Sequence, residues 1–240
     1  MIPPKGSLTW IDKPEGSYLV QDKQKSSSLG RSYYPAEIPV LFHRLATTEI
    51  SKEGILAFAE TYGVLGVELE SWEERWEEFQ ESEGFRYWEK YSNWRGEIKE
   101  MQAAYGFWSS LKKNDEATIR SIFALRRWWG GRLRSLNIWQ NAWTQIGNIT
   151  TDALERYPYT IRPDVDYPAQ SKHMGLTIKF TPRSLISLIW LQFAQAASST
   201  DRWQICEYCS EPFKPESMKA RYCSDSHRQM AYLKRKEAQK

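Results

Sequence analysis

The 240-residue sequence is poor in cysteine and histidine, with three residues of each. Outside one C-terminal stretch only His43 and His173 remain, and isolated histidines are more often core or surface residues than catalytic groups. The chain also has no Ser-His-Asp signature, no glycine-rich phosphate loop and no second set of metal ligands. The sequence therefore gives little support to an enzyme, although a site assembled from distant carboxylates or tyrosines stays open.

A long apolar segment and a strong net charge are also missing. The longest apolar run, residues 185–197, includes Ser187 and Gln192 and is too short to span a bilayer. The N-terminal residues lack the apolar segment of a secretory signal, so we expect a cytoplasmic protein without membrane contact. The net charge is only +3, and any electrostatic recognition of a partner must come from a local patch.

Tryptophan, by contrast, is abundant, and nine of the 12 tryptophans fall between Trp72 and Trp143. Apolar residues that recur every three or four positions predict helices over 51–62, 85–112, 116–125, 133–146 and 182–198. Residues 1–45 and 150–180 are expected to be strands and loops, with 38–42 a short strand or a lead-in segment. These patterns predict an α+β fold, with a mostly helical, Trp-rich N-terminal domain of unknown role over residues 1–200.

The longest of these aromatic stripes runs from Trp88 to Leu111. A stripe of this spacing is typical of a helix that faces a core, and the alternative is an aromatic box that binds a ligand.

Two charged stretches also have two interpretations each. The eight glutamates of 68–83 form either an acidic docking surface or a solvated helix face. The arginines and tryptophans of 126–134, RRWWGGRLR, either bind phosphates and bases or pack as ordinary core and surface.

The C-terminal stretch contains a metal-ligand pattern, C-x2-C-x13-C-x3-H, formed by Cys206, Cys209, Cys223 and His227. Clustered cysteines with a histidine are typical of zinc sites and not of a disulfide framework. Zinc prefers four tetrahedral thiolate or imidazole ligands, and this set fills all four positions. We therefore expect one structural Zn²⁺ and no catalytic metal.

The spacing also predicts the local fold around the metal. Cys206 and Cys209 would lie on a tight turn, and the gap before Cys223 is long enough for a β-hairpin with KARYC as its returning strand. Ser224 is a suitable N-cap for a helix that runs to about Ala238, so that the last two ligands lie around its first turn. We expect a small treble-clef-like zinc finger over 203–240.

The terminal helix of this finger is basic and forms the candidate partner surface. A stripe of cations can contact the phosphates of DNA or RNA; a protein contact and an ordinary solvated helix are the alternatives. The candidate nucleic-acid-binding residues are Arg221, Arg228, Lys234, Arg235 and Lys236.

Residues 185–235 resemble the end of uncharacterised bacterial proteins in which an apolar helix leads into a C-terminal zinc finger. The matching residues are Cys206, Cys209, Phe213, Pro215, Arg221, Tyr222, Cys223, Ser224, Asp225, Arg228 and Gln229. His227 stands where those proteins usually carry a fourth cysteine. The chain is more loosely similar to CGNR zinc-finger proteins, through residues 55–66, although Ser226–His227–Arg228–Gln229 replaces their defining tetrapeptide.

The resemblance implies a regulatory protein that binds nucleic acid, most often DNA, through the finger. The alternative is a protein-interaction module in stress response or phage–host conflict, with no nucleic-acid contact.

Overall fold

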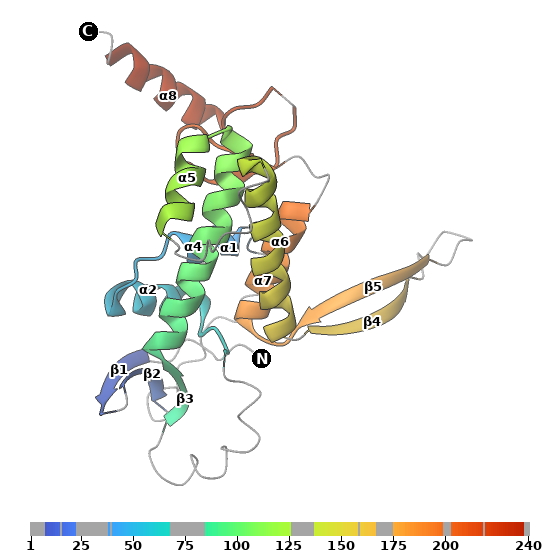
Figure 1. Ribbon diagram of the computed structural model, residues 1–240. Coiled ribbons are helices and arrows are strands. Elements are labelled where there is room, and N and C mark those ends of the chain that lie inside the picture. Colours follow the sequence, from blue (N-terminus) through green and yellow to red (C-terminus); the bar gives the residue numbers. More distant parts are fainter. Residues whose placement is uncertain are drawn as a thin grey trace. The chain divides into compact units, whose positions relative to one another are not determined.

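Helices dominate the described part of the chain, and its sheets are small and antiparallel, which confirms the α+β class (Figure 1). The computed structural model describes residues 8–14, 16–22, 38, 40–67, 85–125, 137–157, 159–166, 175–198, 203–217 and 219–237. The charged stretches 68–83 and 126–134 lie outside these residues, so both interpretations of each stay open.

The chain forms two compact units. Unit 1 comprises Met1–Pro39, Thr48–Ile98 and Thr151–Leu191, and unit 2 comprises Val40–Thr47, Lys99–Thr150 and Gln192–Lys240. Three helices, α4 (Tyr91–Lys113), α6 (Ile138–Arg156) and α7 (Leu185–Ser198), each contribute residues to both units. The division into domains at residues 200–203 stays a prediction.

Unit 1 contains a three-stranded sheet in the order β1-β2-β3. Its strands are β1 (Leu8–Lys13), β2 (Gly16–Asp22) and β3 (Phe85–Lys90). The strand character predicted near the N-terminus is confirmed, whereas the helix predicted over 85–112 is wrong for residues 85–90. That segment, FRYWEK, pairs with β2 and is rich in aromatic residues, which favour strands.

Helix α2 (Lys52–Tyr62) begins and ends as its sequence predicts. Ser51 Oγ accepts a hydrogen bond from the amide of Gly54 at 3.0 Å, and Gly63 ends the helix at a φ of 93° that favours glycine. On its buried face, the Phe58 ring meets the indole of Trp94 edge-on at 5.9 Å. Ser51 and Gly63 thus set the two ends of α2, and the spacing of Ile55, Phe58 and Ala59 sets its buried face.

The aromatic stripe of α4 packs in the core. Trp94, Ile98, Met101 and Trp108 are all fully buried, as the helical spacing predicts for a core-facing stripe. The interpretation of this stripe as core-facing is therefore confirmed for these four residues.

Two buried carboxylates connect the elements of unit 1. Glu89 of β3 accepts hydrogen bonds from three successive backbone amides, those of Leu65, Gly66 and Val67. Glu97 of α4 accepts from Arg156 at 3.0 Å, Tyr157 at 2.5 Å and Trp190 at 3.2 Å. A buried charge requires such partners, and neither carboxylate was singled out by the sequence patterns.

The remaining elements with residues in unit 1 differ from prediction at their ends. Strands β4 (Tyr159–Asp166) and β5 (Gly175–Pro182) pair antiparallel, so Pro182 ends a strand and does not begin a helix. Helix α7 begins after Ser184, whose Oγ accepts from the amide of Ser187 at 3.2 Å. Helix α6 continues ten residues beyond the predicted end at 146, because Ile149 and Ala153 extend its buried stripe.

Unit 2 packs around the short helix α1 (Leu41–Ala46). Leu41 and Phe42 belong to this helix, and the described residues before it, 38 and 40, form no strand. The ring of Phe42 lies within 5.9 Å of both Trp108 and Phe193, so α1 is held by α4 and α7. Helix α5 (Glu116–Leu125) begins at its predicted cap, where Asp115 accepts from the amide of Thr118 at 3.0 Å.

No helix of the described residues has both the length and the hydrophobicity that crossing a bilayer requires.

Candidate metal centre

Two very short strands hold the first pair of cysteines. Strand β6 (Gln204–Ile205) pairs with β7 (Pro212–Phe213), and the turn between them carries Cys206 and Cys209. The amide of Cys206 donates to the Glu211 carbonyl, and that of Ser210 to the Cys206 carbonyl, both at 2.9 Å. The predicted hairpin between Cys209 and Cys223 is therefore wrong, because these backbone bonds place β6 before Cys206. Within the described residues of KARYC there is no strand.

The second pair of ligands lies where the sequence predicts. Helix α8 (Asp225–Glu237) is capped by Ser224, whose Oγ accepts from the amide of His227 at 3.2 Å. Cys223 therefore lies just before the helix and His227 in its first turn. Both ligands are fixed by the same helix N-terminus.

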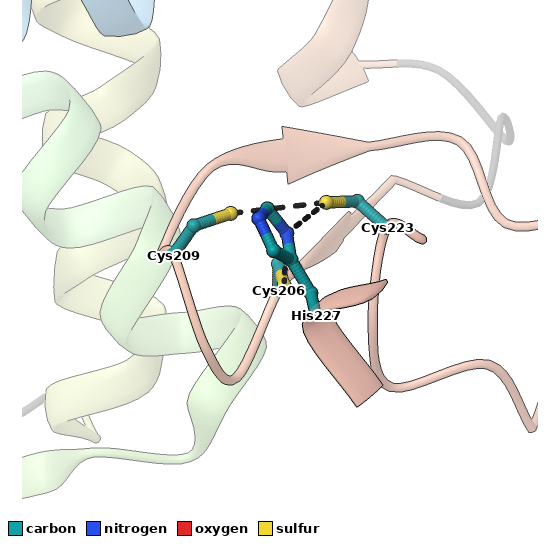
Figure 2. Close-up of side chains that lie close together, drawn as sticks. All are labelled: Cys206, Cys209, Cys223 and His227. Carbon is teal, nitrogen blue, oxygen red and sulfur yellow. Dashed lines mark hydrogen bonds between the residues drawn. The ribbon is translucent and has the colours of Figure 1, made fainter. Parts of the chain in front are cut away.

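The four side chains converge on one point (Figure 2). Their ligand atoms all lie within 4.8 Å of one another. The Cys209 and Cys223 sulfurs are 3.8 Å apart, and His227 Nδ1 lies 4.0 Å from the Cys206 sulfur and 2.9 Å from the Cys223 sulfur. Donors around a tetrahedral zinc ion lie about 3.5–3.8 Å apart, as follows from its bond lengths. The four residues therefore lie close enough to hold a metal ion, with shifts of about an ångström bringing them to tetrahedral spacing.

The thiols of the centre differ in their readiness to ionise. Burial raises the pKa of Cys206, but hydrogen bonds from the backbone of Cys209, Cys223 and Tyr208 outweigh this and lower it to about 6. Partial desolvation and the neighbouring sulfurs of Cys209 and Cys206 raise the pKa of Cys223, which is exposed on one side, to about 12. One thiolate forms readily near neutral pH and opposes the next, and a bound cation removes this repulsion.

Side chains around the ligands close the module. The ring of Tyr208 lies 5.1 Å from that of His227, at an angle of 36°. Glu207 accepts hydrogen bonds from Arg221 at 2.5 Å and from Tyr222 at 3.2 Å. The turn that carries the first two cysteines is thereby attached to the segment that carries the third. Cys206 is buried and Cys223 exposed, so one side of the centre faces solvent.

The module is also attached to the helices of unit 2. Tyr105 of α4 donates to the carbonyl of Ser210 at 3.0 Å, and Arg44 of α1 forms a 2.8 Å ion pair with Glu211. The Trp203 ring, at the entrance to the module, lies 6.4 Å from that of Phe42. These contacts join residues far apart in the chain, and no local sequence pattern could have predicted them.

The predicted nucleic-acid-binding residues fall into two groups. Arg221 is also exposed, and it forms a 2.5 Å ion pair with Glu207 at side-chain exposures of 66% and 40%. The other four lie exposed on α8, which has no buried residue: Arg228, Lys234, Arg235 and Lys236. Arg228 contacts Asp225 at 3.0 Å, in a pair with 66% and 83% exposed side chains, and such surface pairs contribute little.

Comparisons of the chain with protein-family models, with curated proteins and with solved structures give no match. The resemblance to bacterial zinc-finger proteins thus stays a prediction.

Proposed function

We propose that this protein is a cytoplasmic, nucleic-acid-binding regulator whose C-terminal residues form a treble-clef-like finger around one structural zinc ion. DNA is the expected partner. The observation that carries the proposal is that α8 begins at the metal ligands and exposes all four of its basic side chains.

The donor set favours zinc among the divalent metals. Three soft thiolates and an imidazole suit Zn²⁺, whereas Mg²⁺ and Ca²⁺ prefer oxygen ligands. Because Cys206, Cys209, Cys223 and His227 occupy all four positions, the ion has no open position for a substrate. Its role is to hold the fold, and the strands of the module, at two residues each, are too short to do this alone.

The charge of α8 favours a polyanion. The helix carries four basic residues against Asp225 and Glu237, and it stands at the end of a chain with a net charge of only +3. Phosphate neutralisation releases counterions, so binding of this kind weakens linearly in log K against log salt.

The test is a salt series with fluorescently labelled DNA, measured by anisotropy on the zinc-loaded protein. We expect Arg228→Ala and Arg235→Ala each to weaken binding and to reduce the slope of log K against log salt by about one unit. Arg183→Ala is the matched control, because Arg183 is exposed in unit 1. If both α8 variants bind like the Arg183 variant, α8 is not the contact surface and the proposal fails.

The protein-interaction alternative is supported by the exposed apolar residues of α8. Met230 is 48% exposed and Leu233 52% exposed, on a helix that carries no buried residue. Zinc-loaded protein that binds neither DNA nor RNA at low salt would favour this alternative.

A further inference from the structure

One face of α8 combines an aromatic ring with cations. Tyr232 is 59% exposed, and Arg228 and Arg235 lie four residues before it and three after it. At 100° per residue the three side chains share an arc of about 60°. With a rise of about 1.5 Å per residue, the arginines stand about 6 and 4.5 Å along the axis from the tyrosine.

This spacing fits a nucleotide with its flanking phosphates. An exposed phenol ring offers a flat surface on which a base can stack, and the arginines on either side can neutralise the phosphates of the same strand. The Asp225 carboxylate that contacts Arg228 is 83% exposed. A phosphate can replace so weak a surface pair at little cost.

Stacking on Tyr232 distinguishes single from double strands. In a duplex both faces of each base are covered by their neighbours, and a protein reaches only the base edges and the backbone. In a single strand the faces of the bases are available to aromatic side chains. An aromatic ring between two cations therefore recognises unpaired nucleotides better than a duplex.

We propose that the Tyr232 face of α8 binds single-stranded nucleic acid, with a base stacked on Tyr232 and phosphates held by Arg228 and Arg235. This inference rests on the proposed function and narrows its substrate class. The chemistry is shared by DNA and RNA, since neither a base face nor a phosphate reports the sugar.

The test compares three fluorescein-labelled probes by anisotropy at one salt concentration: dT20, dT20 annealed to dA20, and U20. We expect the zinc-loaded protein to bind a single strand about tenfold more tightly than the duplex. Tyr232→Ala should lower single-strand affinity by about tenfold, whereas Tyr232→Phe, which keeps the ring, should stay within about twofold. The relative affinity for dT20 and U20 identifies the sugar that is preferred, and binding of either supports the proposal.

Leu233→Ala is the matched control, because Leu233 is exposed on the same helix but points about 100° away. All variants should keep their zinc and their circular dichroism, since no residue of α8 is buried. Equal affinity for single strand and duplex, or an unchanged single-strand affinity of Tyr232→Ala, overturns the inference. If Arg228→Ala still weakens binding in that case, the proposed nucleic-acid contact survives; if no probe binds at all, both proposals fall.

Discussion

His43 shows how the surroundings of a single residue set its protonation. The ring is buried, and its Nδ1 has no hydrogen-bond partner among the described residues. Burial, helped by the positive charge of Arg44, lowers the pKa of His43 to about 4, while Glu211 acts in the opposite direction. The imidazole is therefore neutral at physiological pH and packs 5.0 Å from the ring of Tyr105.

The depressed pKa makes stability depend on pH. Between the folded value of about 4 and the unfolded value of about 6.5, the unfolded chain binds more protons than the folded one. The free energy of unfolding should therefore be highest above pH 6.5 and fall as the pH is lowered towards 4. Over this pH range, the free energy of unfolding of His43→Phe should fall by roughly 1–3 kcal/mol less than that of the wild-type protein, as measured by denaturant unfolding.

Comparing His43→Phe with the wild-type protein separates the effect of His43 from any effect of the metal centre. Acid also releases metal from thiolates, but it does so in both proteins, and the difference between them isolates His43. Parallel stability curves from pH 4 to 7 would contradict a buried, neutral imidazole at this position.

At the scale of the element, the segment after α2 depends on one carboxylate. Glu89 is 1% exposed and accepts from the amides of Leu65, Gly66 and Val67. Because three successive amides already donate to this carboxylate, a further hydrogen-bond donor cannot be accommodated there. The side-chain NH2 group of a glutamine would be such a donor.

Glu89→Gln should lower the free energy of unfolding by about 2–3 kcal/mol, because hydrogen bonds to a buried charge are replaced by an amide that cannot match them. Denaturant unfolding checks this value. Glu60→Gln, on the exposed face of α2, is the control and should change stability by less than about 0.5 kcal/mol. Equal effects of the two substitutions would mean that Glu89 does not hold this segment.

Elements were predictable where the signal is local. The Ser51 cap of α2, the Asp115 cap of α5 and the Ser224 cap of α8 all lie where short-range rules place them. The element ends that were predicted wrongly depend on partners distant in the chain. Residues 85–90 are a strand because β2 pairs with them, and Pro182 ends a strand because β4 pairs with it.

In the candidate site, too, local features were predictable and features that depend on distant partners were not. The spacing of Cys206, Cys209, Cys223 and His227 was sufficient to predict that they converge, because metal ligands must meet at one point. The position of β6 and the ion pair of Glu207 with Arg221 were not predictable, because each depends on the folded path between the ligands.

At the scale of the whole molecule, the metal centre is part of unit 2. Cys206 and Ile205 are buried, and Tyr105 and Arg44 contact Ser210 and Glu211. The contacts with α1 and α4 support the module, and a metal held by its four ligands would be a second support. A metal in such modules supplies on the order of 10 kcal/mol of folding free energy.

The central claim, that a zinc ion holds the finger together, is tested most directly by hydrogen exchange of the full chain with and without EDTA. The account predicts that EDTA removes the protection of amides in residues 203–237, including those of Cys206 and Ser210, which donate to backbone carbonyls in the turn. Helix α2 in unit 1 should keep its protection, and added zinc should restore the finger. Protection of residues 203–237 that persists in EDTA would contradict the claim.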